Sequence, residues 1–365
     1  MSDQRDARWM RRALRLASRG QGRTSPNPMV GAVIVKRGRA VGEGYHREVG
    51  GAHAEVNALR AAGPAARGAT LYVTVEPCCH YGRTPPCTAA ITKAGVSRVL
   101  AACLDPSPRV NGRGVRALRA AGIAVNVGVL EEEACRLNAA YFKHTKTGLP
   151  LVALKTAMSL DGKIATAAGE SRWITGEKAR LAAHRLRATH DALLVGVGTV
   201  LADDPRLTCR KARGNTPLRV VLDSRARTPA TAALLTADER PAIIAVTRRA
   251  PKGRVRRLKQ AGARVWTVAS RGDRVDLEVL LRRLGKQCIQ SVIVEGGGTA
   301  AAAALAEGLV DRVYFFVAPC IIGGAQSPTA VDGEGVSRLA DAWRMTSTRV
   351  RRLGDDLLIT GDIEG

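Results

Sequence analysis

Aromatic residues are scarce in this chain of 365 residues, of which only 3% are Phe, Trp or Tyr. The cores must therefore be filled by Ala, Val and Leu, and few flat side chains are left for stacking on bases. No run of about twenty apolar residues occurs, which argues against a membrane-spanning helix. The first residues, MSDQRDARWMRR, contain no apolar stretch like that of a secretory signal peptide, so we expect a cytoplasmic protein.

Acidic residues are also under-represented, with 32 Asp and Glu against 57 Lys and Arg, which leaves a formal net charge of +25. The excess is shared almost equally between the parts of the chain before and after residue 145. A charge spread in this way indicates a solvated basic surface, with some of its arginines recruited for anionic phosphate substrates. Nucleic-acid binding is the alternative, and the scarcity of aromatic residues argues against it.

The eight cysteines do not form the framework of a secreted, disulfide-rich protein. Three of them lie within residues 77–87, which read PCCHYGRTPPC, and the other five are scattered singly. Upstream of them stands His53-Ala54-Glu55. A His-x-Glu followed by Pro-Cys and a second Cys is the signature of zinc-dependent nucleobase deaminases.

A catalytic zinc takes three protein ligands and leaves its fourth position to water, which it activates near neutral pH. We predict His53, Cys78 and Cys87 as these ligands. Glu55 is the predicted proton carrier, which moves a proton to the ring and then to the departing ammonia. Cys79 leaves an alternative open, because a fourth thiolate would close the site and make the zinc structural.

Helix starts are expected beside two of the predicted ligands. Residues 52–62 read as a helix with His53 in its first turn, and Pro85-Pro86 predicts a second helix that begins near Cys87. The positive end of a helix favours an anionic ligand and lowers the pKa of a thiol. Both positions therefore suit a metal site.

Strands and helices alternate through both halves of the chain, which predicts layered α/β domains. Residues 147–150, TGLP, read as a linker, so we divide the chain into domains at 1–147 and 148–365. Asn27, on the loop before a strand at 30–35, is expected in the first place to form a turn, and facing the zinc pocket is the open alternative. Expected elements of the second half include strands at 151–158, 191–196, 218–222, 291–294 and 311–317, a helix at 177–188, and a closing hairpin at 350–353 and 357–360.

Three features of the second half suit a nucleotide site. Glu295-Gly296-Gly297-Gly298-Thr299 joins a strand to a helix, where glycines let the backbone approach a phosphate, although a tight turn explains them equally well. Trp173 is either ordinary core or a stacking surface for a flat cofactor ring. The strand at 218–222 ends in Asp223-Ser224-Arg225, in which the Asp favours a ribose 2′-OH and the Ser and Arg favour a 2′-phosphate.

Motifs in both halves carry a family resemblance. The ending GRTPPC at 82–87 makes the first half resemble the cytidine-deaminase superfamily, and within it the deaminases of riboflavin biosynthesis. The second half resembles the riboflavin-pathway reductases, which have a dihydrofolate-reductase-like fold. The matching stretches are 155–163 (KTAMSLDGK), 169–175 (GESRWIT), 199–207 (TVLADDPRL) and 295–299 (EGGGT). Over nearly its whole length the chain resembles the bifunctional deaminase–reductases of riboflavin biosynthesis.

This resemblance implies an N-terminal α/β/α zinc domain, a C-terminal α/β reductase domain and two consecutive reactions. The first would hydrolyse an exocyclic amine from diaminohydroxyphosphoribosylaminopyrimidine. The second would use NADPH to reduce the ribosyl group of 5-amino-6-(5-phosphoribosylamino)uracil to ribityl. The implied NADPH site comprises Ala157, Trp173, Thr199, Asp203, Ser224, Gly297, Gly298, Thr299, Ala300, Ala301, Ala302 and Ala303. The implied substrate site comprises Ser171, Arg187, Leu207, Arg210 and Glu295, whose arginines suit a phosphate.

We expect a homo-oligomer that requires zinc and NADPH and binds neither nucleic acid nor membrane. Ser224 is the expected contact to the 2′-phosphate of NADPH, and the role of Arg225 stays open. The alternative is a basic nucleic-acid-binding or base-editing protein on a deaminase scaffold. The intact set of His, Glu and Cys argues against an inactive scaffold, and an editor would have no use for a nicotinamide site.

Overall fold

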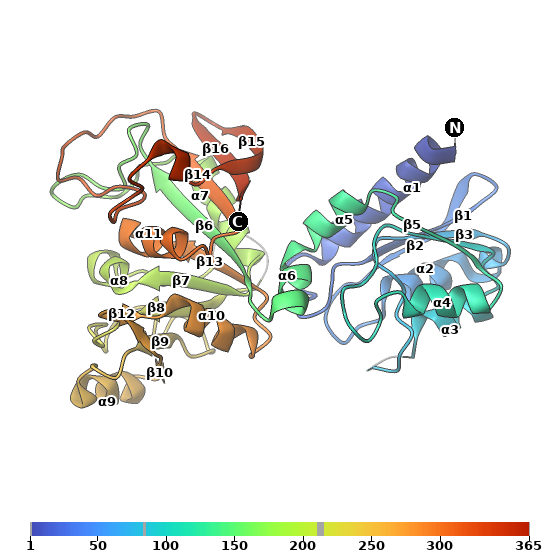
Figure 1. Ribbon diagram of the computed structural model, residues 1–365, viewed down its shortest axis with the longest axis horizontal. Helices are drawn as coiled ribbons and strands as arrows, with labels where there is room; N and C mark the ends of the chain where they lie inside the picture. Colours follow the sequence, from blue (N-terminus) through green and yellow to red (C-terminus); the bar gives the residue numbers. More distant parts are fainter. Residues whose placement is uncertain (1, 83–84, 210–214, 365) are drawn as a thin grey trace. The chain divides into compact units, whose positions relative to one another are not determined.

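The chain forms two compact units, Met1–Gly148 and Leu149–Gly365, in a computed structural model that describes residues 2–82, 85–209 and 215–364 (Figure 1). Each unit has its own sheet and its own buried core. Among the described residues, no helix is both long enough and apolar enough to span a membrane.

The first unit is a five-stranded sheet between two layers of helices, in the strand order β2-β1-β3-β4-β5. Strand β1 (Gly31–Lys36) is antiparallel to β2 (Arg39–Tyr45) and to β3 (Thr70–Val73), while β3, β4 (Arg98–Ala101) and β5 (Ala124–Val127) are parallel. One face is covered by α2 (Ala54–Ala62), α3 (Cys87–Lys93) and α4 (Arg113–Ala120). The other carries α1 (Ser2–Ala17), α5 (Glu131–Leu137) and α6 (Ala139–Thr147) (Figure 1). The predicted α/β/α layering is confirmed.

The residues of β1 show why helices cover both faces. Ala32 and Ile34 are buried on the face of α2, while Val33 and Val35 are buried on the face of α1. A strand without polar alternation needs cover on both sides. On β2, Gly44 lets α2 approach closely, because a Cβ there would lie 2.5 Å from the backbone nitrogen of Ala58. Helix α2 therefore rests on the sheet through backbone contact.

The second unit contains a nine-stranded sheet in the order β10-β9-β8-β7-β13-β6-β14-β16-β15. Its parallel part comprises β6 (Leu151–Met158), β7 (Ala192–Gly196), β8 (Leu218–Leu222), β9 (Ile243–Val246), β10 (Arg264–Thr267), β13 (Ser291–Glu295) and β14 (Arg312–Val317). An antiparallel hairpin of β15 (Met345–Leu353) and β16 (Asp356–Ile363) completes one edge.

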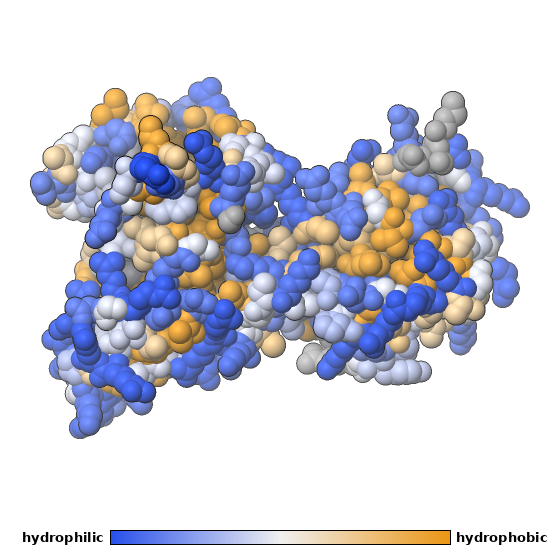
Figure 2. Space-filling view, in the orientation of Figure 1, coloured by the Kyte–Doolittle hydropathy of each residue, from blue (hydrophilic) through white to orange (hydrophobic). Residues whose placement is uncertain are grey.

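Helices cover both faces of this second sheet. Helices α10 (Leu277–Gly285) and α11 (Gly298–Ala306) pack on one face, and α7 (Glu177–Ala188) packs on the other. Helix α9 (Lys252–Gln260) links β9 to β10, and Figure 2 shows a hydrophilic surface where it lies. The strands and the helix expected in this half are present, and the hairpin is longer at both outer ends than its apolar residues predicted.

Three local predictions need correction. His53 is the N-cap residue of α2, with extended backbone angles, and not part of its first turn. Strand β2 was not expected, since its sequence RAVGEGY is rich in glycine and charge, which weakens a strand signal. Helix α8 (Val197–Asp203) was also not expected, because Gly198 makes the segment look like a loop.

The close contact at Gly44 gives a stability prediction. Gly44→Ala should lower the free energy of unfolding of the first unit by about 1–3 kcal/mol, because the new methyl group overlaps the backbone of α2. Gly82→Ala is the matched control, since nothing lies within 4 Å of a Cβ there, and it should change stability by less than about 0.5 kcal/mol. Urea unfolding followed by circular dichroism measures both. Equal stabilities would show that α2 can move away from the sheet without cost.

Candidate functional site

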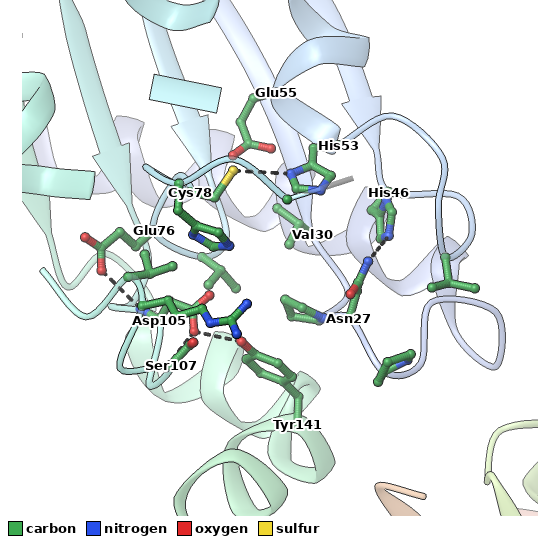
Figure 3. Close-up of a pocket in the computed structure, with 18 of the residues that line it drawn as sticks. Asn27, Val30, His46, His53, Glu55, Glu76, Cys78, Asp105, Ser107 and Tyr141 are labelled. Atoms are coloured by element: carbon green, nitrogen blue, oxygen red, sulfur yellow. Dashed lines mark hydrogen bonds between the residues drawn. The ribbon is translucent and has the colours of Figure 1, made fainter. Parts of the chain in front are cut away.

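Three potential metal ligands converge at the N-terminal ends of α2 and α3. His53 caps α2, Cys87 is the first residue of α3, and Cys78 lies on the loop after β3. Their ligand atoms all lie within 4.8 Å of one another. Nδ1 of His53 is 3.6 Å from Sγ of Cys78 (Figure 3). The same nitrogen is 3.3 Å from Sγ of Cys87. One imidazole and two thiols form a donor set that fits zinc and leaves one position for water.

Cys79 lies outside this group. Its thiol is directed at the carbonyl oxygen of Arg109, with Sγ 3.8 Å from that atom. Among the residues that the structure describes, the metal-ligand group contains His53, Cys78 and Cys87 without Cys79. The arrangement therefore favours an open, three-ligand site over the closed structural alternative.

Glu55 lies in the first turn of α2, beside the three ligands, and is only 3% exposed (Figure 3). Burial, aided by the negative charge of the Cys78 thiolate, raises the pKa of its carboxyl to about 7. A carboxyl group with such a pKa can both accept and donate a proton near neutral pH. Hydrogen bonding by Cys87, together with His53, lowers the pKa of the Cys78 thiol to about 4, which prepares a thiolate for the metal.

The ligands open into a cavity of about 490 Å³. On one side Nδ2 of Asn27 lies 3.1 Å from Nε2 of His46, and Nδ1 of His46 lies 3.2 Å from the carbonyl oxygen of Ala52 (Figure 3). The backbone of Asn27 also forms the expected turn, by donating to the carbonyl of Thr24 at 2.7 Å. The turn expected at Asn27 is confirmed, and the same residue also lines the cavity, which was its open alternative.

The opposite wall is built around Asp105. Its Oδ1 accepts hydrogen bonds from the hydroxyl of Tyr141 and from the backbone nitrogen of Ser107, both at 2.8 Å (Figure 3). Burial raises the pKa of the Asp105 carboxyl. No motif reveals this wall in the sequence, because its residues come from the loop after β4 and from α6.

A further residue missing from the predictions, Glu76, anchors the loop that carries Cys78. Its Oε2 accepts from the backbone nitrogens of Gly112, at 2.8 Å, and Asp105, at 3.3 Å. Its Oε1 accepts from the backbone nitrogen of Val115 at 2.9 Å, and the side chain is buried. Gly112 is the N-cap residue of α4, so Glu76 also anchors the start of that helix.

In the second unit, predicted cofactor residues gather at one edge of the sheet. Strands β6, β7, β8 and β13 are neighbours or near neighbours in one parallel array, so their carboxyl ends meet at the same edge. Ala157 lies at the end of β6. Thr199 follows β7, Ser224 follows β8, and the glycine turn formed by Gly296 and Gly297 follows β13. Open α/β sheets bind nucleotides at this edge.

The glycine turn is required by its geometry. Gly296 and Gly297 have φ angles of 70° and 73°, which glycine adopts without strain. A Cβ on Gly296 would lie 3.1 Å from Oγ1 of Thr199, so the turn passes close to that side chain. Ala300 and Ala301 have side chains in the core, which leaves only their backbone for a ligand. A glycine turn leading into the N-terminus of α11 fits the pyrophosphate of a dinucleotide.

Trp173 is 70% exposed, which excludes its interpretation as ordinary core. The guanidinium carbon of Arg180 lies 4.7 Å from the ring centroid. Nearby in the sequence, the hydroxyl of Ser171 donates to Oδ1 of Asp203 at 3.3 Å, so a predicted substrate residue contacts a predicted cofactor residue. An indole ring with this exposure fits a role in stacking on a flat cofactor.

Arg187 and Glu295 form a buried, two-pronged ion pair, with N–O distances of 2.9 and 2.6 Å. Nζ of Lys155 lies 3.9 Å from the same carboxylate. Although burial opposes ionisation, the two cations hold the pKa of Glu295 at about 2. Arg187 can therefore contact a substrate phosphate only while it also remains paired with Glu295. Leu207 is buried, and Arg210 lies outside the described residues.

The turn after β8 bears on the choice between NADH and NADPH. The carboxylate of Asp223 is buried and accepts from the backbone nitrogens of Arg227 and Thr228 and from the hydroxyl of Thr228. It closes the turn and is not presented to a ribose. Ser224 accepts at its Oγ from the backbone nitrogen of Val275, at 3.1 Å, and so keeps its hydroxyl proton to donate. The geometry thus removes the feature that favoured NADH.

Two sequence families match the chain. The cytidine and deoxycytidylate deaminase zinc-binding region matches residues 3–103, and the RibD C-terminal domain matches residues 150–359. The riboflavin biosynthesis protein RibD of Actinobacillus pleuropneumoniae is 44% identical over 355 residues, which cover 97% of this chain and 94% of that protein. RibD of Escherichia coli strain K12 is 42% identical and covers 97% of this chain and 98% of its own.

Solved structures agree with these matches. RibD of Acinetobacter baumannii has a TM-score of 0.89 at 40% identity, with both chains fully covered. A diaminohydroxyphosphoribosylaminopyrimidine deaminase/5-amino-6-(5-phosphoribosylamino)uracil reductase from Thermotoga maritima has a TM-score of 0.86 at 35% identity, again over both full chains. The likeness thus extends through the zinc-binding region and the reductase region alike, and the chain belongs to the RibD family of bifunctional deaminase–reductases in riboflavin biosynthesis.

Proposed function

We propose that residues 1–147 hydrolyse an exocyclic amine from diaminohydroxyphosphoribosylaminopyrimidine, and that residues 148–365 reduce the ribosyl group of the resulting 5-amino-6-(5-phosphoribosylamino)uracil with NADPH. One observation carries the first assignment: His53, Cys78 and Cys87 meet beside the buried carboxyl of Glu55. The two substrates are those named for the Thermotoga maritima relative. The site geometry adds which residues of this chain would do the work.

In the first reaction His53, Cys78 and Cys87 would hold zinc, which when bound makes water acidic enough to act as a nucleophile near neutral pH. Glu55 takes up a proton and passes it to the ring and then to the leaving ammonia, a task that suits its raised pKa. Asn27 and His46 on one wall, with Asp105 and Tyr141 on the other, orient the pyrimidine.

In the second reaction the cofactor lies along the carboxyl edge of the sheet. Ser224 donates to the 2′-phosphate, the glycine turn faces the pyrophosphate, and Trp173 stacks on a flat ring. The remaining proposed cofactor contacts are Ala157, Thr199, Asp203 and the backbone of 297–303. Ser171, Arg187, Leu207, Arg210 and Glu295 are proposed to hold the substrate, with the ionised Glu295 kept in place by Arg187 and Lys155.

A homo-oligomer in the cytoplasm completes the proposal, since a reducing compartment suits the thiolate ligands Cys78 and Cys87. Nucleic acid is not proposed as a partner, because among the described side chains few large aromatics are exposed. RNA binding that persists at physiological salt would contradict this part.

The role of Glu55 is tested by Glu55→Gln. This variant should retain about one zinc per chain yet lose deamination by roughly 10²–10⁴-fold, because only the proton carrier is removed. Ammonia release and NADPH oxidation are followed together, with the pyrimidine substrate and then with substrate already deaminated. Reduction of the deaminated substrate should survive as the internal control. Deamination close to the wild-type rate would refute the role given to Glu55.

The ligand set is tested by three serine variants. Cys79→Ser should keep both zinc and deamination, since its thiol points to Arg109, whereas Cys78→Ser and Cys87→Ser should lose both. Zinc content by atomic absorption and ammonia release are the two measurements. A Cys79→Ser protein without zinc and without activity would mean that the ligands are wrongly assigned.

Cofactor choice is tested by Ser224→Asp. An unmade hydrogen bond and a new repulsion should weaken use of NADPH by about 1–3 kcal/mol, with NADH use little changed. Steady-state rates with both cofactors, for wild type and variant, give the result. An equal loss with both would place Ser224 at the shared ribose or in the fold, and not at the 2′-phosphate.

A further inference from the structure

Three chain segments meet at Ser224. Its carbonyl oxygen accepts hydrogen bonds from the backbone nitrogen of Thr247, at 3.1 Å, and from the Thr247 hydroxyl, at 2.9 Å. Its own hydroxyl oxygen accepts from the backbone nitrogen of Val275, at 3.1 Å. The loop after β8 is thus tied to the loop after β9 and to β12 (Arg274–Val275), and Figure 1 shows these three elements together.

Each of these segments carries an arginine next to its point of contact. Arg225 follows Ser224, Arg248 follows Thr247, and Arg274 precedes Val275 in the chain. All three are exposed. Across 2–82, 85–209 and 215–364, no ion pair or side-chain hydrogen bond involves the guanidinium group of Arg225, Arg248 or Arg274.

Three carboxylates belong to these segments or adjoin them, and all are already engaged. Asp276, which follows Val275, accepts from the backbone nitrogen of Val279 and pairs with Arg271. Asp223 is buried and is held by the backbone and hydroxyl of Thr228 and by the backbone of Arg227. Asp273 forms an ion pair with Arg249. The charge of the three arginines is therefore not balanced locally, and the surroundings of Ser224 attract an anion.

We propose that Arg225, Arg248 and Arg274 form, with the hydroxyl of Ser224, the site that recognises the 2′-phosphate of NADPH. This inference rests on the NADPH-dependent reduction proposed above and assigns its cofactor specificity to three separate segments. A phosphate dianion suits the planar donor groups of arginine, and charge-assisted bonds of this kind are roughly twice as strong as neutral ones. NADH would leave the three cations unpaired.

Binding to the intact chain can be measured without turnover, with adenosine 2′,5′-bisphosphate and adenosine 5′-monophosphate as probes in calorimetry. Wild-type protein should prefer the bisphosphate, and this preference should weaken as salt is raised. Arg225→Gln, Arg248→Gln and Arg274→Gln should each weaken bisphosphate binding by roughly tenfold. The dissociation constant of each variant for the monophosphate should stay within about twofold of the wild-type value. Retained monophosphate binding also shows that the variant is folded.

Arg257→Gln is the matched control. Arg257 is an exposed arginine in the last turn of α9, the helix between parallel strands β9 and β10, so it lies toward the opposite edge of the sheet. Its loss should leave the preference for the bisphosphate unchanged. A loss as large as in the three variants would overturn the inference, because general charge and not the cluster would be responsible.

Two other results separate the inference from the function on which it rests. If wild-type protein prefers the bisphosphate and all three variants retain that preference, the arginine cluster is refuted while NADPH remains the cofactor. If wild-type protein binds both probes equally, the proposed NADPH preference itself is refuted, and the role of the cluster is refuted with it.

Discussion

Glu76 accepts hydrogen bonds from three backbone N–H groups, and the geometry of the deaminase site depends on this anchor. The three donors belong to the loop after β4 and to the start of α4, while Glu76 itself stands two residues before Cys78. A buried carboxylate with three N–H donors is well satisfied and strongly held. Since Asp105 is one of the donors, the same interaction places the ligand loop and one wall of the substrate pocket relative to each other.

The second unit relies on a comparable device built from charges. Glu295 ends β13, where the central strands of the parallel array meet the glycine turn, and it stays ionised because Arg187 and Lys155 flank it. Removing one partner of such a buried pair leaves an uncompensated charge, so the three residues act as one group. Each unit thus has a buried carboxylate beside its candidate site. Glu76 is held by backbone N–H groups, and Glu295 is held by the cationic side chains of Arg187 and Lys155.

The sequence indicated the candidate metal ligands, which the structure brings together, because they lie in two short motifs whose chemistry depends on residue type and order. It also predicted the central strands, whose apolar runs are long. It did not reveal Asp105, Tyr141 or Glu76, since their partners are distant in the chain and a lone Asp or Glu has no local signature. Lys155 stood within a recognised stretch, KTAMSLDGK, yet its pairing with Glu295 depends on the register of β6 and β13. The sequence could not decide whether Asp223 faces a ribose, because only the structure shows that its carboxylate is hydrogen-bonded within the turn after β8.

The contact between α2 and β2 has a consequence for the heat response of the metal site. Around Gly44 the backbone of the helix lies close to the backbone of the strand. Rotamer changes, which loosen ordinary side-chain packing as temperature rises, have no counterpart in such a contact. His53 and Glu55 lie at the start of that helix, so side-chain rotamer changes at this contact should not displace them. Warming should therefore shift Cys78, on its loop, before it shifts His53 and Glu55 on α2.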